Sequence, residues 1–152
     1  MDSKKFLNKF WDKTIPVDIF AIAQKAGVDL APDWEPNAPS GRCFWENNKP
    51  FIRYNGSEHI VRQRFTIAHE LGHLFLNHGS KFRDTPEEYR ISAYDPLETE
   101  ANQFAAEVLM PNIAIEYLIK KKDIYSPDEM AKRLNVSEIA MKYRLKNLGW
   151  IS

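Results

Sequence analysis

The chain has 152 residues and a mass of 17.7 kDa, the size of one ordinary domain. Its 21 basic and 21 acidic side chains cancel, so no whole-molecule field attracts it to nucleic acid or to an anionic membrane. The composition, with 43% apolar residues but no long apolar stretch, predicts a folded globule without a transmembrane helix or signal peptide. Cys43 is the single cysteine, which excludes an intramolecular disulfide and makes the cytoplasm the expected compartment.

The first part of the chain predicts two helices followed by a small sheet. Apolar periodicity indicates helices over residues 2–12 and after Pro16. Residues 31–40 contain three prolines and predict an irregular connection. Two short segments rich in β-forming residues, 42–46 and 51–54, are expected to pair as an antiparallel hairpin.

The remainder of the chain is expected to be helical. The longest helix should run from about Glu58 to His78, with Ser57 as its N-cap and Gly79 after its end. Capping residues and apolar periodicity predict the other helices over residues 96–110, 112–121 and, as a pair similar to a helix-turn-helix, 126–149. We therefore expect a single α+β domain over residues 1–152, mainly helical, with a small antiparallel sheet.

The longest expected helix carries the sequence His69-Glu70-Leu71-Gly72-His73. Residues four apart lie one turn apart on the same face, so the two histidines can bind one metal ion. Glu70 lies beside them and can take a proton from a metal-held water without binding the metal itself. The run predicts two metal ligands and a general base; the alternative is a helix whose histidines contact only protein or water.

A catalytic zinc site normally needs a third protein ligand and keeps one position for water. His59 and His78 lie too far along the helix from His69 to complete the site easily. Carboxylates of the helix that begins near Pro96 are better candidates, and helical periodicity leaves three of them open: Glu98, Glu100 and Glu107.

Two segments resemble the ImmA/IrrE family of gluzincin-like metallopeptidases. One is residues 62–73, which end in the His-Glu-x-x-His run, and the other is residues 98–111, which contain Ala101-Asn102 and end at Pro111. Weaker similarity reaches upstream and downstream and covers most of the chain. The resemblance implies a zincin-like fold and Glu100, immediately before the Ala-Asn pair, as the third ligand.

The resemblance also implies what the protein acts on. It predicts a zinc-dependent endopeptidase whose substrate is a helix-turn-helix transcriptional repressor, with Glu70 as the catalytic base. Imidazole ligands favour zinc, although a His-His-Glu set also accepts manganese. The rival hypothesis is a non-catalytic module that binds and inactivates a transcriptional regulator.

Two further features leave alternatives open. An oxyanion formed during hydrolysis needs a hydrogen-bond donor, and the metal can be assisted by Tyr89, Tyr94, His78 or Arg64.

The C-terminal helical pair has a weak basic excess, five cationic against three anionic side chains over residues 128–146. Because DNA readers show a clearer basic stripe, packing on the peptidase body or docking of the substrate is favoured over DNA contact.

Overall fold

The protein is described by a computed structural model that covers residues 1–78, 81–84 and 95–152. It is an α+β structure, as predicted. The helices are α1 (Ser3–Phe10), α2 (Ile19–Lys25), α3 (Ile60–Phe75), α5 (Pro96–Leu109), α6 (Asn112–Lys122), α7 (Pro127–Leu134) and α8 (Glu138–Asn147). The strands are β1 (Asp29–Asp33), β2 (Gly41–Glu46), β3 (Lys49–Asn55) and β4 (Lys81–Asp84).

The predicted hairpin is confirmed as β2 and β3, at the centre of a sheet with the strand order β1-β3-β2-β4. Its turn is tighter than expected and consists of Asn47 and Asn48, which both have positive φ angles, 51° and 63°. Two successive positive φ angles are typical of a type I′ turn, whose twist matches that of the paired strands.

The sheet differs from the prediction in being mixed. β1 pairs in parallel with β3, and β4 pairs antiparallel with β2. β1 extends into residues 31–40, which we expected to be irregular because of their prolines. Pro32 is tolerated because β1 is an edge strand, where the missing N–H of proline costs no hydrogen bond within the sheet.

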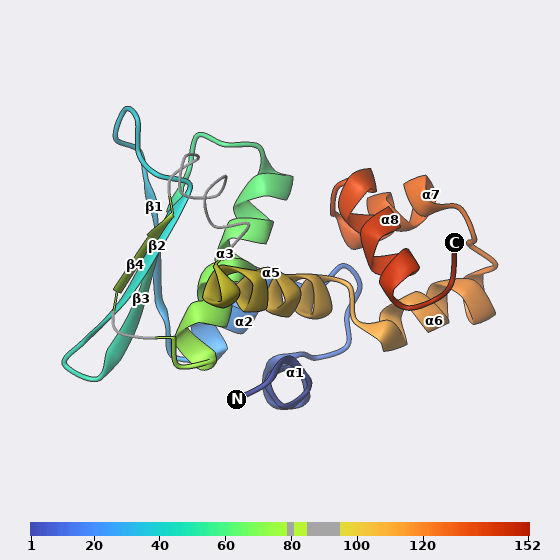
Figure 1. Ribbon diagram of the computed structural model, residues 1–152, viewed down its shortest axis with the longest axis horizontal. Helices are drawn as coiled ribbons and strands as arrows, with labels where there is room; N and C mark the ends of the chain where they lie inside the picture. Colours follow the sequence, from blue (N-terminus) through green and yellow to red (C-terminus); the bar gives the residue numbers. More distant parts are fainter. Residues whose placement is uncertain (79–80, 85–94) are drawn as a thin grey trace.

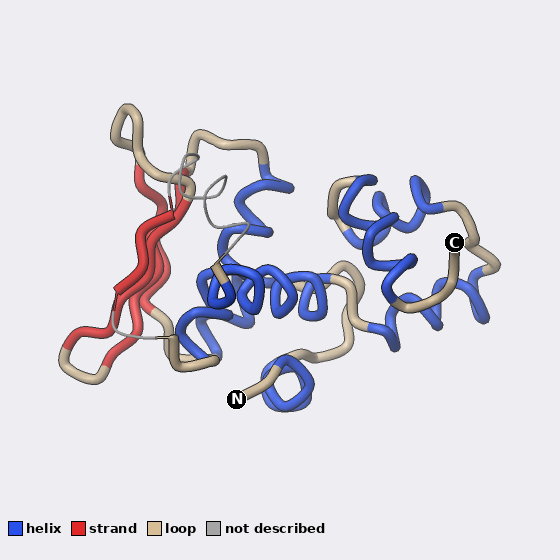
Figure 2. Tube along the Cα trace, viewed as in Figure 1, coloured by secondary structure: helices blue, strands red, loops and turns tan. Residues whose placement is uncertain are grey.

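The helices are arranged in layers beside the sheet (Figure 1; Figure 2). α3 packs against β2 and β3, and α5 packs against α3. α1 contacts α5, whereas α6, α7 and α8 lie at the end of the molecule remote from the sheet. None of the described helices combines the length and the apolarity that a membrane crossing would require.

The ends of α3 differ from the predicted ones. His59, not Ser57, is the N-cap, and its Nδ1 accepts a hydrogen bond from the backbone N–H of Val61. Ser57 instead belongs to the preceding turn, where its N–H donates to the side chain of Asn55. The helix ends at Phe75, before Asn77, whose φ angle is 61°. By contrast, the predicted caps Asp95 and Ser137 each accept a backbone hydrogen bond.

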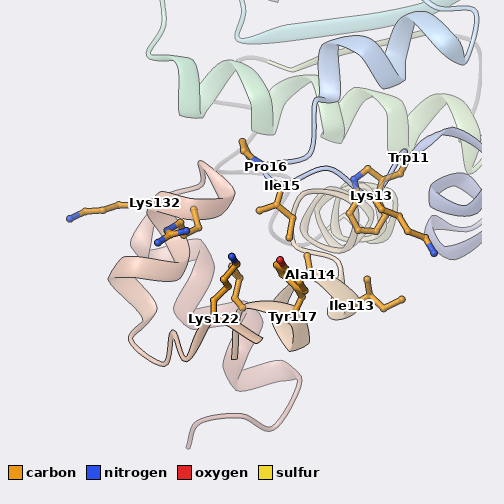
Figure 3. Close-up of a pocket in the computed structure, with 11 residues that line it drawn as sticks. Trp11, Lys13, Ile15, Pro16, Ile113, Ala114, Tyr117, Lys122 and Lys132 are labelled. Carbon is orange, nitrogen blue, oxygen red and sulfur yellow. The ribbon is translucent and has the colours of Figure 1, made fainter. Parts of the chain in front are cut away.

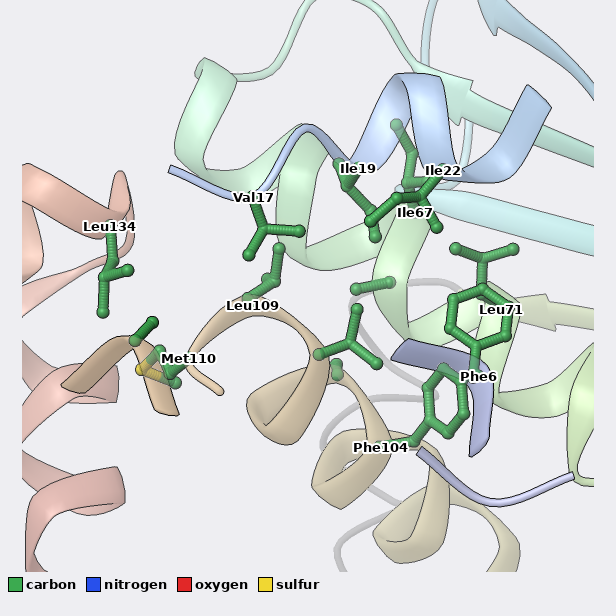
Figure 4. Packing of buried hydrophobic residues seen from close by; sticks show 14 of the residues in the cluster. Phe6, Val17, Ile19, Ile22, Ile67, Leu71, Phe104, Leu109, Met110 and Leu134 are labelled. Atoms are coloured by element: carbon green, nitrogen blue, oxygen red, sulfur yellow. The ribbon is translucent and has the colours of Figure 1, made fainter. Parts of the chain in front are cut away.

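One hydrophobic core runs through the helical layers (Figure 4). Phe6 of α1 is completely buried and its ring packs against those of Phe75 and Phe104, at centroid distances of 5.1 and 5.3 Å. The core continues through Met110 to Leu134 of α7. Burial of this apolar surface is the main term that holds the layers together.

Two buried arginines connect the C-terminal helices to the rest of the protein. The guanidinium of Arg64, on α3, donates to the carbonyl oxygens of Val17, Leu134 and Asn135, at 2.8, 3.2 and 3.1 Å. Arg144 of α8 donates from Nε to the carbonyl oxygen of Met110 at 2.9 Å. Burial lowers the pKa of both arginines from the ordinary value.

Gly72 allows α3 and α5 to approach closely between the two histidines of the His-Glu-x-x-His run. A Cβ atom at this position would lie 3.1 Å from Cα of Ala101 and 3.2 Å from Cβ of Phe104. Gly72→Ala is therefore expected to separate the helices and lower the free energy of unfolding by roughly 1–3 kcal/mol, less the small gain in helix propensity. Urea unfolding followed by circular dichroism measures this change; an unaltered midpoint would contradict the close packing.

Candidate metal centre

α3 presents both histidines of the predicted run to α5. His69 and His73 are one turn apart and buried, with exposed fractions of 0% and 1%. Their Nε2 atoms are 3.1 Å apart, and the ring of Phe65, one turn earlier, lies 6.1 Å from the ring of His69. The helical spacing therefore brings the two imidazole nitrogens to one point, as the sequence predicted.

Glu98 of α5 completes a group of three side chains that could hold a metal ion. Its carboxylate oxygens lie 2.8 Å from Nε2 of His69 and 3.0 Å from Nε2 of His73. Within the described ranges, His69, His73 and Glu98 are the group of histidine, cysteine and acidic residues whose ligand atoms all lie within 4.8 Å of one another. All three residues are buried.

The chemistry of these three donors fits a zinc ion. Two imidazole nitrogens and one carboxylate oxygen form the donor set of many catalytic zinc sites. Bond lengths of about 2.0–2.1 Å and tetrahedral geometry separate zinc ligands by roughly 3.3 Å. The present separations of 2.8–3.1 Å are shorter by only a few tenths of an ångström, so small side-chain movements would accommodate the ion.

Glu98 is held in its ionised form. Burial alone would raise the pKa of its carboxyl group, but the hydrogen bonds and positive charge offered by His69 and His73 outweigh burial. The pKa consequently lies well below its ordinary value. Glu98 is also in the first turn of α5, where the helix dipole favours a negative charge.

The other two candidate carboxylates lie elsewhere. Glu100, the third ligand implied by the family resemblance, has a side chain that is 56% exposed, and its Oε1 lies 3.5 Å from Nε2 of His78. Glu107 accepts a hydrogen bond from Ser3 of α1 at 3.0 Å. The geometry thus differs from the expectation for Glu100: two residues along a helix is a rotation of about 200°, so Glu98 and Glu100 face opposite ways.

Asn102 orients the first histidine. Its Oδ1 lies 2.8 Å from Nδ1 of His69, on the side of the ring away from Glu98. Because an amide oxygen only accepts hydrogen bonds, Nδ1 of His69 carries a proton, and Nε2 is the ring nitrogen that would exchange its proton for a metal.

Asn102→Ala is expected to weaken metal binding by roughly 10- to 100-fold, the usual effect of removing a partner that orients a ligand. Titration with a competing chelator measures the affinity. Gln103→Ala, an exposed neighbour on the same helix, is the matched control and should bind metal like the unaltered protein. Equal affinities in the two variants would rule out an orienting role for Asn102.

His78 supports the second histidine. Its Nδ1 lies 3.0 Å from Nδ1 of His73, and Glu100 is on its other side. Burial and the neighbouring His73 lower the pKa of His78, although the Glu100 carboxylate opposes this. His78, one of the predicted oxyanion donors, thus lies against Nδ1 of His73, on the opposite side of that ring from Glu98.

Glu70 is fixed between α3 and the sheet. Its side chain is completely buried. A Cβ atom on Gly41, the first residue of β2, would lie 3.2 Å from both Cγ and Oε1 of Glu70 and would collide with Thr66. Glycine at position 41 therefore leaves the space that the Glu70 carboxylate occupies.

Among the remaining oxyanion candidates, the structure describes Arg64. Arg64 uses its guanidinium to bind backbone carbonyl groups of the C-terminal half and of the segment before α2. Tyr89 and Tyr94 lie outside the described residues.

A local signal in the sequence could have identified Glu98 and Asn102 as a pair. The two residues are one turn apart on α5, just as His69 and His73 are on α3. Two packed helices that each present a pair of polar residues at a spacing of four are suited to a shared site. What the sequence did not provide was the angle at which the helices cross.

Part of the chain is similar in sequence to known proteins. Metallopeptidase ImmA of Bacillus subtilis (strain 168) is 31% identical over 98 residues, which are 63% of this chain and 56% of ImmA. The radiation response metalloproteases IrrE of Deinococcus radiodurans and Deinococcus deserti are 33% and 34% identical over 101 residues, or 62% of this chain. The matched regions span 30% and 35% of those two proteins.

The chain thus matches about a third to just over half of the length of these relatives. The family as a whole matches a larger part of the chain than these individual relatives do. The sequence pattern of the IrrE N-terminal-like domain, a peptidase family, matches residues 23–146, which include α3, α5 and the three clustered side chains. With most of its length matched, the chain belongs to the IrrE N-terminal-like family of metallopeptidases.

Proposed function

We propose that the protein is a zinc-dependent endopeptidase with His69, His73 and Glu98 as the metal ligands and Glu70 as the general base. The observation that carries the proposal is the convergence of two imidazole nitrogens and one carboxylate, all buried, next to a buried glutamate on the same helix. The names of the relatives, a metallopeptidase and two metalloproteases, support the same reaction class. Zinc is the metal that this donor set favours, with manganese as the alternative.

The bound metal would supply a Lewis acid that polarises the peptide carbonyl group and makes water more acidic. Glu70 accepts the proton of the attacking water and delivers it to the nitrogen of the leaving amine. The carboxylate of Glu98 and the Nε2 atoms of His69 and His73 would hold the metal, and Asn102 keeps a proton of His69 on Nδ1. Hydrolysis of an amide needs no other co-reactant.

The proposed substrate is a helix-turn-helix transcriptional repressor, cleaved in the cytoplasm. This part of the proposal rests on the resemblance of residues 62–73 and 98–111 to the ImmA/IrrE family. The rival hypothesis is a module that binds a transcriptional regulator without cutting it. Such a module would contact the same regulator but would release no cleavage fragment.

The helical pair α7–α8, which we propose to be helix-turn-helix-like, suits protein contact better than DNA contact. Arg144 is buried and bound to a carbonyl group, and Lys142 is paired with Glu138 at 3.1 Å. The exposed face of α8 instead presents Ile139 and Tyr143, which are 77% and 70% exposed. Large exposed apolar side chains favour a protein partner, and a DNA-reading surface would be more basic.

The experiment compares protein N-termini in host cells that express either the unaltered protein or the Glu70→Gln variant. We expect new N-termini within a transcriptional repressor only in cells with the unaltered protein. Purified protein prepared without added metal should contain about one zinc ion per chain, and His69→Ala should contain none. A full complement of zinc with no difference in N-termini would contradict the peptidase proposal and favour the capture module.

A further inference from the structure

A cavity lies on the side of the molecule formed by the N-terminal segment and the C-terminal helices. It has a volume of about 700 Å³ and opens between residues 11–16, α6 and α7. In Figure 3, Ile15 and Pro16 face Tyr117 and Lys122 across it. None of the proposed metal ligands or the general base lines this cavity.

The floor of the cavity is apolar and includes two aromatic side chains. Trp11 is fixed by a hydrogen bond from its Nε1 to the carbonyl oxygen of Thr14 at 3.0 Å. Ile113 and Tyr117, on successive turns of α6, remain 57% and 45% exposed although they line the cavity. Apolar side chains left this open at a concave surface are typical of a ligand site.

The rim of the cavity is cationic. Four of its eleven lining residues are basic and none is acidic: Lys13, Lys122, Lys132 and Arg133. Lys122 lies over the ring of Tyr117 at 5.9 Å, while Lys132 extends away from the centre of the cavity. Arg133 is partly neutralised by Glu129 at 3.3 Å. The excess of cationic over anionic side chains in the lining therefore favours an anion.

We propose that this cavity binds a small amphiphilic organic anion, with an aromatic or aliphatic body on the apolar floor and an acidic group at the cationic rim. The volume lies within the usual range of small-molecule sites, about 300–1,000 Å³. The combination of apolar floor and cationic rim distinguishes this ligand class from neutral apolar molecules and from inorganic anions. The site is independent of the proposed hydrolysis, and Glu70→Gln should leave it unchanged.

The probe is 1-anilinonaphthalene-8-sulfonate, an aromatic anion whose fluorescence rises on transfer to an apolar site. Its neutral analogue, N-phenyl-1-naphthylamine, has the same aromatic body without the charge. For the unaltered, metal-loaded protein we expect tighter binding of the anion than of the analogue and a loss of this preference at high salt. The double variant Lys122→Gln/Arg133→Gln should weaken anion binding by roughly five-fold or more and leave binding of the neutral analogue unchanged.

Two matched variants locate the site. Lys142→Gln/Lys146→Gln removes two cations of α8 that do not line the cavity and should bind the anion like the unaltered protein. Ile113→Ser, at an exposed position that does not support the core, should weaken both probes. The proposal would be overturned if the two double variants bound the anion equally well. It would also be overturned if Ile113→Ser left the binding of both probes unchanged. Circular dichroism and thermal unfolding of each variant verify the fold.

Discussion

Replacing Glu70 by glutamine is expected to abolish peptide-bond cleavage while leaving the metal in place. Glutamine keeps the volume of the buried side chain but cannot accept a proton from water. General acid–base catalysis contributes roughly 10²- to 10⁴-fold to a rate, so kcat/KM should fall by at least this range. Elemental analysis of the same sample should give the metal content of the unaltered protein, because Glu70 is not among the clustered ligands.

A carboxylate remote from the site provides the control for this experiment. Glu46 is exposed at the end of β2, and Glu46→Gln should retain both metal and activity. An active Glu70→Gln protein would exclude the proposed general base. A Glu70→Gln protein that still inactivates its regulator in cells without producing any fragment would instead support the capture module.

Glu98→Gln is expected to remove the metal, whereas Glu100→Gln should retain it. The carboxylate of Glu98 lies within 3.0 Å of both histidine Nε2 atoms, but that of Glu100 is more than half exposed and contacts His78. Loss of a residue that only orients a ligand weakens metal binding by about 10- to 100-fold, so loss of the ligand itself should cost roughly 100-fold or more. Glu100→Gln should cost about ten-fold or less, because its effect passes through His78 and His73.

Chelator competition with both purified variants separates the two carboxylates. The two residues are two positions apart on the same helix, and both substitutions replace a carboxylate by an amide. Each variant is therefore a control for the other. Unfolding by urea verifies that both variants are folded before metal affinities are compared. The opposite outcome, with metal lost in Glu100→Gln and kept in Glu98→Gln, would restore the ligand that the family resemblance implies and would reject Glu98.

Local chemistry explains why most helices could be predicted from the sequence. Asp95 followed by Pro96, and Ser137, start their helices as expected because a cap depends on neighbouring residues only. The hairpin turn at Asn47-Asn48 is also local. The parallel pairing of β1 with β3 is not, because nothing in residues 29–33 specifies a partner that follows them in the chain by about twenty positions.

The same distinction applies to the site. His69 and His73 could be predicted because both lie on one helix at a spacing that their geometry fixes. The third carboxylate depends on how α5 crosses α3, and that crossing depends on Gly72 and on the packing of Phe104. The helical periodicity of α5 alone therefore could not choose among Glu98, Glu100 and Glu107.

The hydrogen bonds of Arg64 determine where this chain can be shortened. Two of the three carbonyl groups that its guanidinium binds belong to Leu134 and Asn135. A fragment that stopped after α5 would keep all three clustered side chains, yet the guanidinium of Arg64 would lose two of its three carbonyl acceptors, and the core residues that pack against the C-terminal helices would be exposed to water. The C-terminal helices thus supply hydrogen-bond acceptors to a charged residue of α3. The smallest fragment expected to fold extends through α8, because Arg144 of that helix connects it to Met110.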